Sequence, residues 1–233
     1  MEKIRATLRF TSPDHHGERA LQAPVTDLII AGWTGSDAQA IEAHIAELEK
    51  LGVRRPAKTP IFYRGACALL TQDDAIEVVG SHASGEVEPV IVSTEQGLWL
   101  GLGSDHTDRQ MEAVGVTVSK QLCAKPVCAE FWQLERVANH WDQLIVRSWI
   151  TRDGERRLYQ EGPLAKMRHP YELFGLYGGD DYVPAPGVVM FCGTLAVHGD
   201  LTPAESFEME LEDPVLKRRL HHSYRVRELP VEG

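Results

Sequence analysis

The sequence has little basic charge and no long apolar run. It carries 24 Lys and Arg residues against 34 Asp and Glu, which gives a formal net charge of −10. Nucleic acids and anionic membranes attract basic surfaces, so we expect neither as a partner. No stretch approaches the roughly 18 consecutive apolar residues that span a membrane. The expected partner is a small molecule, and it can be anionic where a bound cation reverses the local charge.

Cysteine is scarce and shows no pairing pattern. The four cysteines form no Cys-x-x-Cys pair, and their spacing fits neither a zinc site nor a disulfide framework. Their neighbours are apolar or small, which predicts buried, reduced thiols. The first six residues contain no apolar core of the kind found in a signal peptide. Together these features predict a cytoplasmic protein.

The motifs of several large enzyme classes are absent. The sequence contains no Gly-x-Ser-x-Gly elbow, no phosphate-binding P-loop and no His-Glu-x-x-His zinc pattern. Serine hydrolase, nucleotide-phosphate and zinc-peptidase functions therefore have no support.

A chain of 233 residues suits one domain, or one domain with a small subdomain. The basic, proline-bounded stretch 54–60 predicts a boundary. We expect an N-terminal α/β subdomain over 1–58 and a catalytic domain over 59–233. In the first part, residues 5–10 and 25–31 predict strands.

Hydrophobic periodicity predicts most of the remaining elements. A helix is expected between Ser36, which resembles an N-cap, and Gly52, which would end it. Its apolar face would consist of Ala38, Ile41, Ile45 and Leu48. Later β-like runs recur between turn residues, at 61–63, 75–79, 87–92, 98–102, 114–118, 144–150, 188–192 and 207–211. After residue 60, helices are expected only at 129–139 and 170–175, so the predicted fold class is α+β, mostly β.

Two glutamates, Glu86 and Glu88, begin one of these β-branched runs. Residues i and i+2 of a strand project to the same face, so both carboxylates should lie side by side. Such a pair repels and is costly to bury unless a hard cation lies between the two groups. Oxygen ligands favour Mg²⁺, Mn²⁺ or Ca²⁺ over zinc. The alternative is a solvent-facing pair on an edge strand.

Asp105 follows the run 98–102, which we expect to pair with the glutamate strand as a hairpin. An antiparallel return would bring Asp105 within ligand distance of Glu86 and Glu88. Three carboxylates around one hard cation, with water completing the shell, make a plausible octahedral site. The alternative for Asp105 is an ordinary loop residue.

Further residues fit a ligand site beside these acids. Lys120 ends an alternating run, and its ammonium group suits a substrate carboxylate or proton transfer, although a solvated charge is the alternative. Lys125 is the other candidate, but it precedes Pro126 and resembles a loop residue. Gly193 and Thr194 end an apolar strand, where a hydroxyl and backbone N–H groups can bind an anion. A simple turn is the alternative there.

Two histidines lie close to the acids in the sequence. His82 lies four residues before Glu86, and His106 directly follows Asp105. Either could act as a general base on a water beside the metal. The alternative for each is a surface position or a hydrogen-bonded structural role.

Several segments occur in the order that is typical of the fumarylacetoacetate hydrolase family, and the chain resembles that family over residues 59–227. The segments that carry the resemblance are 59–64, 85–92, 104–105, 119–126 and 186–196. The chain also resembles a prokaryotic group known only as a domain of unknown function.

The resemblance implies a mixed β-roll with few helices, a homodimer, and a divalent-metal-dependent hydrolase or lyase. Such an enzyme cleaves a C–C bond in, or decarboxylates, a small 2-oxo acid or β-dicarbonyl acid through a metal-stabilised enolate. Mg²⁺ or Mn²⁺, with Ca²⁺ as a further option, would be held by Glu86, Glu88 and Asp105. We expect Lys120 to act in catalysis, with His82 or His106 as the candidate base, and Arg64, Gly193 and Thr194 to bind the substrate.

The sequence departs from the family pattern at several points. Leu195 stands where the family has proline, and Cys123 where an aspartate commonly follows the lysine. A short hairpin replaces the helix that the family inserts between Glu88 and Asp105, and the usual His–Glu pair is not identifiable. Two alternatives therefore stay open: a non-catalytic small-ligand-binding protein on the same scaffold, and a metal-dependent isomerase or hydratase.

Overall fold

The structure is a computed structural model that describes residues 6–14, 20–50, 55–56 and 58–232. Strands make up 46% of the residues and helices 20%, which confirms the predicted α+β, mostly β class. Gly52 and positions 54 and 57 of the predicted linker lie outside the described residues. None of the described helices is both long and apolar enough to cross a membrane.

Two sheets form the body of the fold, and the first has six strands in the order β12-β9-β8-β15-β3-β4. Its strands are β3 (Asp27–Gly32), β4 (Ile61–Gly65), β8 (Val87–Thr94), β9 (Gly97–Ser104), β12 (Trp132–Gln133) and β15 (Val188–Phe191). β15 runs parallel to β3 and antiparallel to β8, so the sheet is mixed, as predicted. The Val- and Ile-rich run of β8 is buried on both faces, which explains why it does not alternate.

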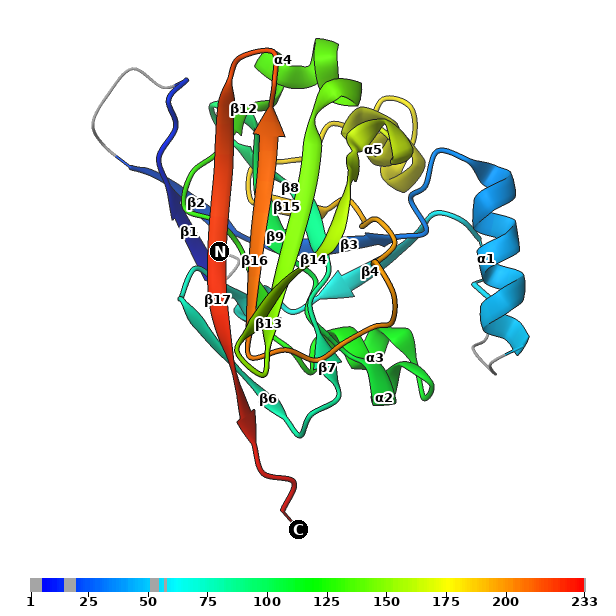
Figure 1. The fold of residues 1–233 in the computed structure, drawn as a ribbon. Coiled ribbons are helices and arrows are strands. Elements are labelled where there is room, and N and C mark those ends of the chain that lie inside the picture. The colour runs from blue at the N-terminus through cyan, green and yellow to red at the C-terminus, as the bar shows by residue number, and fades with distance from the viewer. Residues whose placement is uncertain (1–5, 15–19, 51–54, 57, 233) are drawn as a thin grey trace.

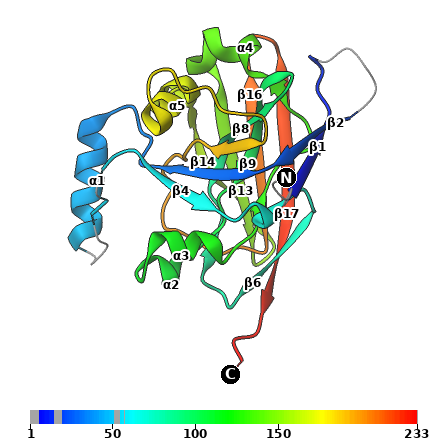
Figure 2. The same cartoon turned by 180° about the vertical axis from the view of Figure 1, so that it is seen from behind.

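The second sheet has five strands in the order β14-β13-β16-β17-β6. They are β6 (Ala75–Val79), β13 (Ile145–Arg152), β14 (Glu155–Pro163), β16 (Ser206–Asp213) and β17 (Arg218–Leu229). In β16, Phe207, Met209 and Leu211 are buried at every second position, which gives this sheet one core face. β16 and β17 run across the direction of β3 and β4, as Figures 1 and 2 show.

Short elements surround the two sheets. The helices are α1 (Ala38–Lys50), α2 (Arg109–Glu112), α3 (Val116–Gln121), α4 (Leu134–Val137) and α5 (Pro170–Gly178), with 3-10 turns η1 (Cys67–Leu69), η2 (Ala138–Gln143) and η3 (Leu164–Lys166). Three small pairs complete the structure: β1 (Ala6–Phe10) with β2 (Leu21–Val25), β5 (Leu70–Thr71) with β11 (Lys125–Pro126), and β7 (Ala83–Ser84) with β10 (Thr107–Asp108).

The N-terminal part of the chain is joined to the six-stranded sheet. β3 lies between β15 and β4, so residues before 59 contribute a strand to the same core. Only α1 stands to the side of the sheets (Figure 1). Of its predicted apolar face, Ile45 is buried and Ala38 is exposed, and the side chain of Leu48 lies outside the described part. A division between residues 58 and 59 stays a prediction.

Two predicted elements differ from the structure, one in type and one in its starting residue. Residues 114–118 were expected to form a strand, but α3 begins at Val116, and Val114 and Val118 are exposed. Alternating β-branched residues imitate a strand there, whereas the buried residues Ser119 and Lys120 mark the inward side of a helix. The helix expected at 129–139 begins only at Leu134, because β12 precedes it as an edge strand beside β9, and α4 continues into the 3-10 turn η2.

Asp213 joins the end of β16 to the turn that follows. Its side chain is fully buried, and its Oδ1 accepts hydrogen bonds from the backbone N–H groups of Val215 and Leu216, each at 3.0 Å. His140 Nε2 lies 3.1 Å from Oδ1, and Arg218 Nε donates to Oδ2. Burial alone would raise the pKa of Asp213, but these hydrogen bonds outweigh it and lower the pKa below its usual value.

Asp213→Asn is expected to lower the free energy of unfolding at pH 7 by about 1–3 kcal/mol, because charge-assisted hydrogen bonds are lost. The carboxylate stabilises the folded chain above its usual pKa, and this contribution disappears as the pH falls below about 4. Urea denaturation at pH 7 and pH 3 should therefore show a difference between parent and variant that shrinks in acid. Asp153→Asn, at an exposed turn, is the control. Equal urea midpoints for parent and Asp213→Asn at pH 7 would contradict this prediction.

Candidate metal centre

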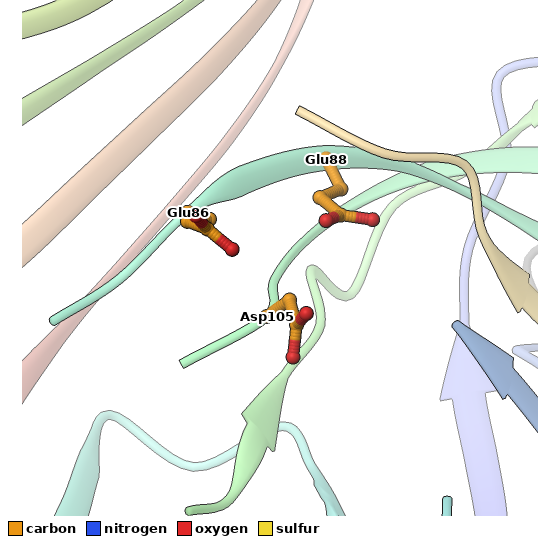
Figure 3. A group of neighbouring side chains, drawn as sticks. All are labelled: Glu86, Glu88 and Asp105. Carbon is orange, nitrogen blue, oxygen red and sulfur yellow. The ribbon is translucent and has the colours of Figure 1, made fainter. Parts of the chain in front are cut away.

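Glu86 and Glu88 flank Val87, the first residue of β8. Figure 3 shows the two glutamate side chains near Asp105, with the Glu86 and Glu88 groups on the same side of their segment. Glu88 is buried, whereas the Glu86 side chain is 16% exposed. The alternative of a solvent-facing pair on an edge strand is wrong, because β8 lies between β9 and β15.

The β8–β9 hairpin brings Asp105 back to the glutamates. The antiparallel pairing begins with Val87 opposite Ser104 and closes in a two-residue loop. Asp105 follows β9, and its backbone N–H donates to Glu86 O at 2.9 Å. One oxygen from each of the three carboxylates lies within 4.8 Å of the others. The predicted hairpin and the predicted grouping are observed, and metal ligation by these residues stays a prediction.

Two lysines flank Asp105. Lys120, on α3, donates to Asp105 Oδ2, and its Nζ lies 3.9 Å from Glu86 Oε2. Lys125, on β11, is fully buried, and its Nζ lies 2.9 Å from Asp105 Oδ1. The sequence suggested a loop position for Lys125. The sequence does contain an indication that Lys125 is buried and paired. It is the one charged residue in the otherwise uncharged stretch 121–129, and a buried charge needs a partner.

Arg109, on α2, is a third cation that the sequence did not single out. Its Nη2 lies 3.2 Å from Glu86 Oε1, and its Nε donates to Ser84 Oγ at 2.8 Å. Its Nη1 lies 3.2 Å from Glu112 Oε2. Nothing in the local sequence separates this residue from a surface arginine, because its partners Ser84 and Glu86 lie more than 20 residues earlier in the chain and only Glu112 is local.

The acids of the cluster have opposite electrostatic environments. Burial raises the pKa of Glu88 well above its usual value, and the charge of Asp105 adds to that rise. Burial would also raise the pKa of Asp105, but the charges of Lys120 and Lys125 outweigh it and hold that pKa far below its usual value. Burial would lower the pKa of Lys120, yet Asp105 and Glu86 raise it above its usual range. The cluster therefore holds an ionised Asp105 beside a Glu88 whose charged form is disfavoured.

The donor set fits a hard divalent cation. The buried carboxylate of Glu88 accepts a hydrogen bond from the backbone N–H of Gly193 at 2.8 Å. Oδ1 of Asp105 meets Lys125 as an ion pair, without a hydrogen bond of good geometry. Lone pairs therefore remain on buried oxygens, and oxygen ligands of this kind suit Mg²⁺, Mn²⁺ or Ca²⁺.

The Gly193–Thr194 turn closes over Glu88. Gly193 has a φ of +94°, and a Cβ at this position would meet Thr34 Oγ1 at 1.8 Å, so glycine is required. The hydroxyl of Thr194 donates to Val87 O at 2.7 Å and accepts from Gln160 Nε2 at 2.7 Å. Thr194 thus ties the turn to β8, and its predicted contact with substrate stays a prediction.

Arg64 lies on β4 with its side chain 55% exposed. It forms an ion pair with Asp27, and its Nη1 donates to Tyr177 Oη at 3.1 Å. The structure therefore gives the guanidinium group a carboxylate of the chain itself. Its predicted role in binding a substrate carboxylate is not tested.

The two histidines lie in different environments. His82 is exposed, and its carbonyl accepts from the backbone N–H of Arg109. His106 is buried, and its Nδ1 lies 2.9 Å from the hydroxyl of Tyr224, which donates to Ser104 Oγ. Burial, with the charge of Lys125, lowers the pKa of His106 to about 3, so its ring is neutral at pH 7. The role of either as a base stays a prediction.

Comparisons with known proteins place the chain in a family and identify its fold. A family model described as Protein of unknown function (DUF2848) matches residues 31–224. The comparison with curated proteins gave no match. Fumarylpyruvate hydrolase from Pseudomonas aeruginosa, solved in complex with Mn²⁺ and pyruvate, is similar with a TM-score of 0.60 and 16% identity, covering 97% of this chain and 97% of that chain. For 2-hydroxyhepta-2,4-diene-1,7-dioate isomerase from Mycobacterium marinum, the TM-score is 0.61 and the identity 17%, covering 90% of this chain and 78% of that chain.

Identities this low establish the fold and leave the reaction open. The fold agrees with the fumarylacetoacetate hydrolase-like roll that the sequence predicts. The family match covers most of the chain. The chain belongs to the family described as Protein of unknown function (DUF2848), and it has a fumarylacetoacetate hydrolase-like fold.

Proposed function

We propose that the chain is a divalent-metal-dependent enzyme that acts on a small 2-oxo acid or β-dicarbonyl acid, as a hydrolase or a lyase. The cluster of Glu86, Glu88 and Asp105 carries this proposal, because its buried oxygen donors fit a hard cation. A structural neighbour in complex with Mn²⁺ and pyruvate, itself a 2-oxo acid, supports the choice of substrate class.

Each residue of the cluster has its own role in this proposal. Glu86, Glu88 and Asp105 would hold the cation, which would supply positive charge where negative charge develops on the substrate. Lys120 is the more exposed of the two lysines beside Asp105, and its ammonium group would pair with a substrate carboxylate. The ring of Tyr63 lies 5.9 Å from Lys120 Nζ and would limit the positions open to that ligand. Gly193 N–H would keep Glu88 in place.

The finer assignments belong to the same proposal. We infer Mg²⁺ or Mn²⁺ as the metal, a homodimer as the assembly and the cytoplasm as the location. The four cysteines support a reducing compartment, because all are free and buried.

Purified protein with Mn²⁺ is expected to turn over at least one of oxaloacetate, an acylpyruvate or a hydroxylated 2-oxo acid, and to lose this activity on treatment with EDTA. Re-addition of Mn²⁺ should restore it. Lys120→Met should abolish turnover while Mn²⁺ still binds, whereas Lys58→Met, at an exposed site, should change neither. Turnover that survives complete removal of metal would refute the proposed mechanism.

A binding function on the same scaffold is the second candidate. It is favoured by the environments of the two histidines that were expected to act as general bases. His82 is exposed, and His106 is hydrogen-bonded to Tyr224. Thermal stabilisation by oxaloacetate with Mn²⁺, without turnover of any substrate, would support this candidate over the enzyme. A product with the same composition as its substrate would instead indicate an isomerase.

A further inference from the structure

Lys125 is fixed firmly behind Asp105. β11 pairs with β5, and the next residue along, Val127, donates its N–H to Thr71 O at 2.9 Å. The Lys125 side chain has no exposed surface, its Nζ contacts Asp105 Oδ1, and it donates to His106 O. A buried ammonium group is stable only while such partners remain. Lys125 therefore holds its charge at one place in the site.

Lys120 differs from Lys125 in having a second carboxylate partner. Its side chain is 10% exposed, and its Nζ approaches carboxylates of both Asp105 and Glu86. It can exchange one anionic partner for another without leaving a buried charge unpaired. Lys125 has no second carboxylate among the ion pairs of the described residues. Lys125 therefore stays beside Asp105, its one carboxylate partner among the described residues.

The charges of the site nearly cancel. Four carboxylates and three cations meet there: Glu86, Glu88, Asp105, Glu112, Arg109, Lys120 and Lys125. With every carboxylate ionised, one divalent cation would leave a single net positive charge. Without Lys125, the same loaded site would be neutral. Lys125 therefore decides whether the metal-loaded site attracts an anion through its net charge.

We propose that Lys125 couples the divalent cation to an anionic ligand: it weakens the binding of the cation alone and strengthens the binding of an anion beside the bound cation. This inference rests on the proposed metal site. Two positive charges that share one carboxylate would repel in a buried environment of low dielectric constant. An anion relieves that repulsion, and linkage makes the effect reciprocal, so each ligand raises the affinity of the other by the same factor. The preferred ligand class is an acid ionised at neutral pH.

The test measures Mn²⁺ affinity of the full chain by isothermal titration calorimetry, with and without oxalate, corrected for Mn²⁺–oxalate complexes in solution. Lys125→Gln keeps an amide donor toward Asp105 and removes the charge. Without oxalate, this variant is expected to bind Mn²⁺ at least about tenfold more tightly than the parent. The gain in Mn²⁺ affinity on adding oxalate should be at least about tenfold smaller in the variant.

Matched variants separate charge from structure. Lys125→Arg keeps the charge and should preserve the coupling to oxalate, and Lys166→Gln, at an exposed site, should leave both affinities unchanged. Thermal unfolding with and without Mn²⁺ keeps the test valid if Lys125→Gln lowers the stability of the fold. Mn²⁺ should raise the melting temperature of Lys125→Gln more than that of the parent. A variant that stays unfolded in saturating Mn²⁺ would overturn the inference in favour of a structural role.

The outcomes also separate this inference from the proposed function. A parent that binds no Mn²⁺ would overturn both. A parent that binds Mn²⁺, with equal affinity and equal coupling in Lys125→Gln, would overturn the inference alone and leave the metal site in place.

Discussion

Glu88→Gln is expected to weaken Mn²⁺ binding at least about hundredfold, since changes to residues that merely support a metal ligand already cost 10–100-fold. The same substitution should leave the chain as stable as the parent, or more stable. Burial raises the pKa of Glu88, so the folded state disfavours its charged form, and a neutral amide removes that cost. The amide oxygen can still accept the hydrogen bond from Gly193 N–H. Calorimetric titration with Mn²⁺ and thermal unfolding measure the two effects.

The two measurements on Glu88→Gln distinguish a loss of metal ligation from a loss of folding stability. Glu95→Gln is the matched control, because Glu95 lies in the exposed loop of the same hairpin. It should change neither Mn²⁺ affinity nor melting temperature. An unchanged Mn²⁺ affinity in Glu88→Gln would remove Glu88 from the ligand set, and a large loss of stability would show that its charge holds the fold.

Asp105→Asn is expected to lower the free energy of unfolding by about 3–5 kcal/mol, the usual cost of removing one partner from a buried ion pair. Lys125 would lose its carboxylate partner in the described structure, and Lys120 would keep only the more distant Glu86. The asparagine keeps the size of the side chain, so the loss would reflect charge and hydrogen bonding. Urea denaturation followed by circular dichroism measures the change.

Asp108→Asn is the control for this experiment. Asp108 lies three residues away and caps α2, where its side chain accepts from Met111 N. Asparagine caps helices about as well as aspartate, so this variant should unfold within about 0.5 kcal/mol of the parent. An equally small change in Asp105→Asn would mean that the two lysines find other partners or lose their charge.

The β8–β9 hairpin is predictable because its signals are local. A β-branched run, a short polar turn and a second apolar run lie within the stretch 87–104, and the direction of the return places Asp105 beside Glu86. The segment 114–118 shows where local signals fail. Its alternating valines favour a strand, but the structure forms a helix there, with Ser119 and Lys120 buried and Val114 and Val118 exposed.

The rest of the site depends on contacts between distant segments. Gln160 accepts from Val87 N and donates to Thr194 Oγ1, so it joins β14 to both sides of the Glu88 position. β14 and β17 carry many charged residues on their outer face, so they lack the apolar runs that predict the other strands. Lys125 lies beside Asp105 because its segment pairs with β5 and is also bonded to β9. Pairings of this kind leave no mark in a short window of sequence.

The two-residue loop of the β8–β9 hairpin also bears on how the chain assembles its site. Hairpins form in about 1–10 μs, and contacts between distant segments form more slowly because long loops must close. The three carboxylates can therefore meet before Gly193, which is 105 residues from Glu88, arrives to bind it. The acids are neighbours along the chain while Gly193 and Gln160 are not, so we expect an acidic hairpin to form during folding ahead of the backbone and amide groups that later enclose it.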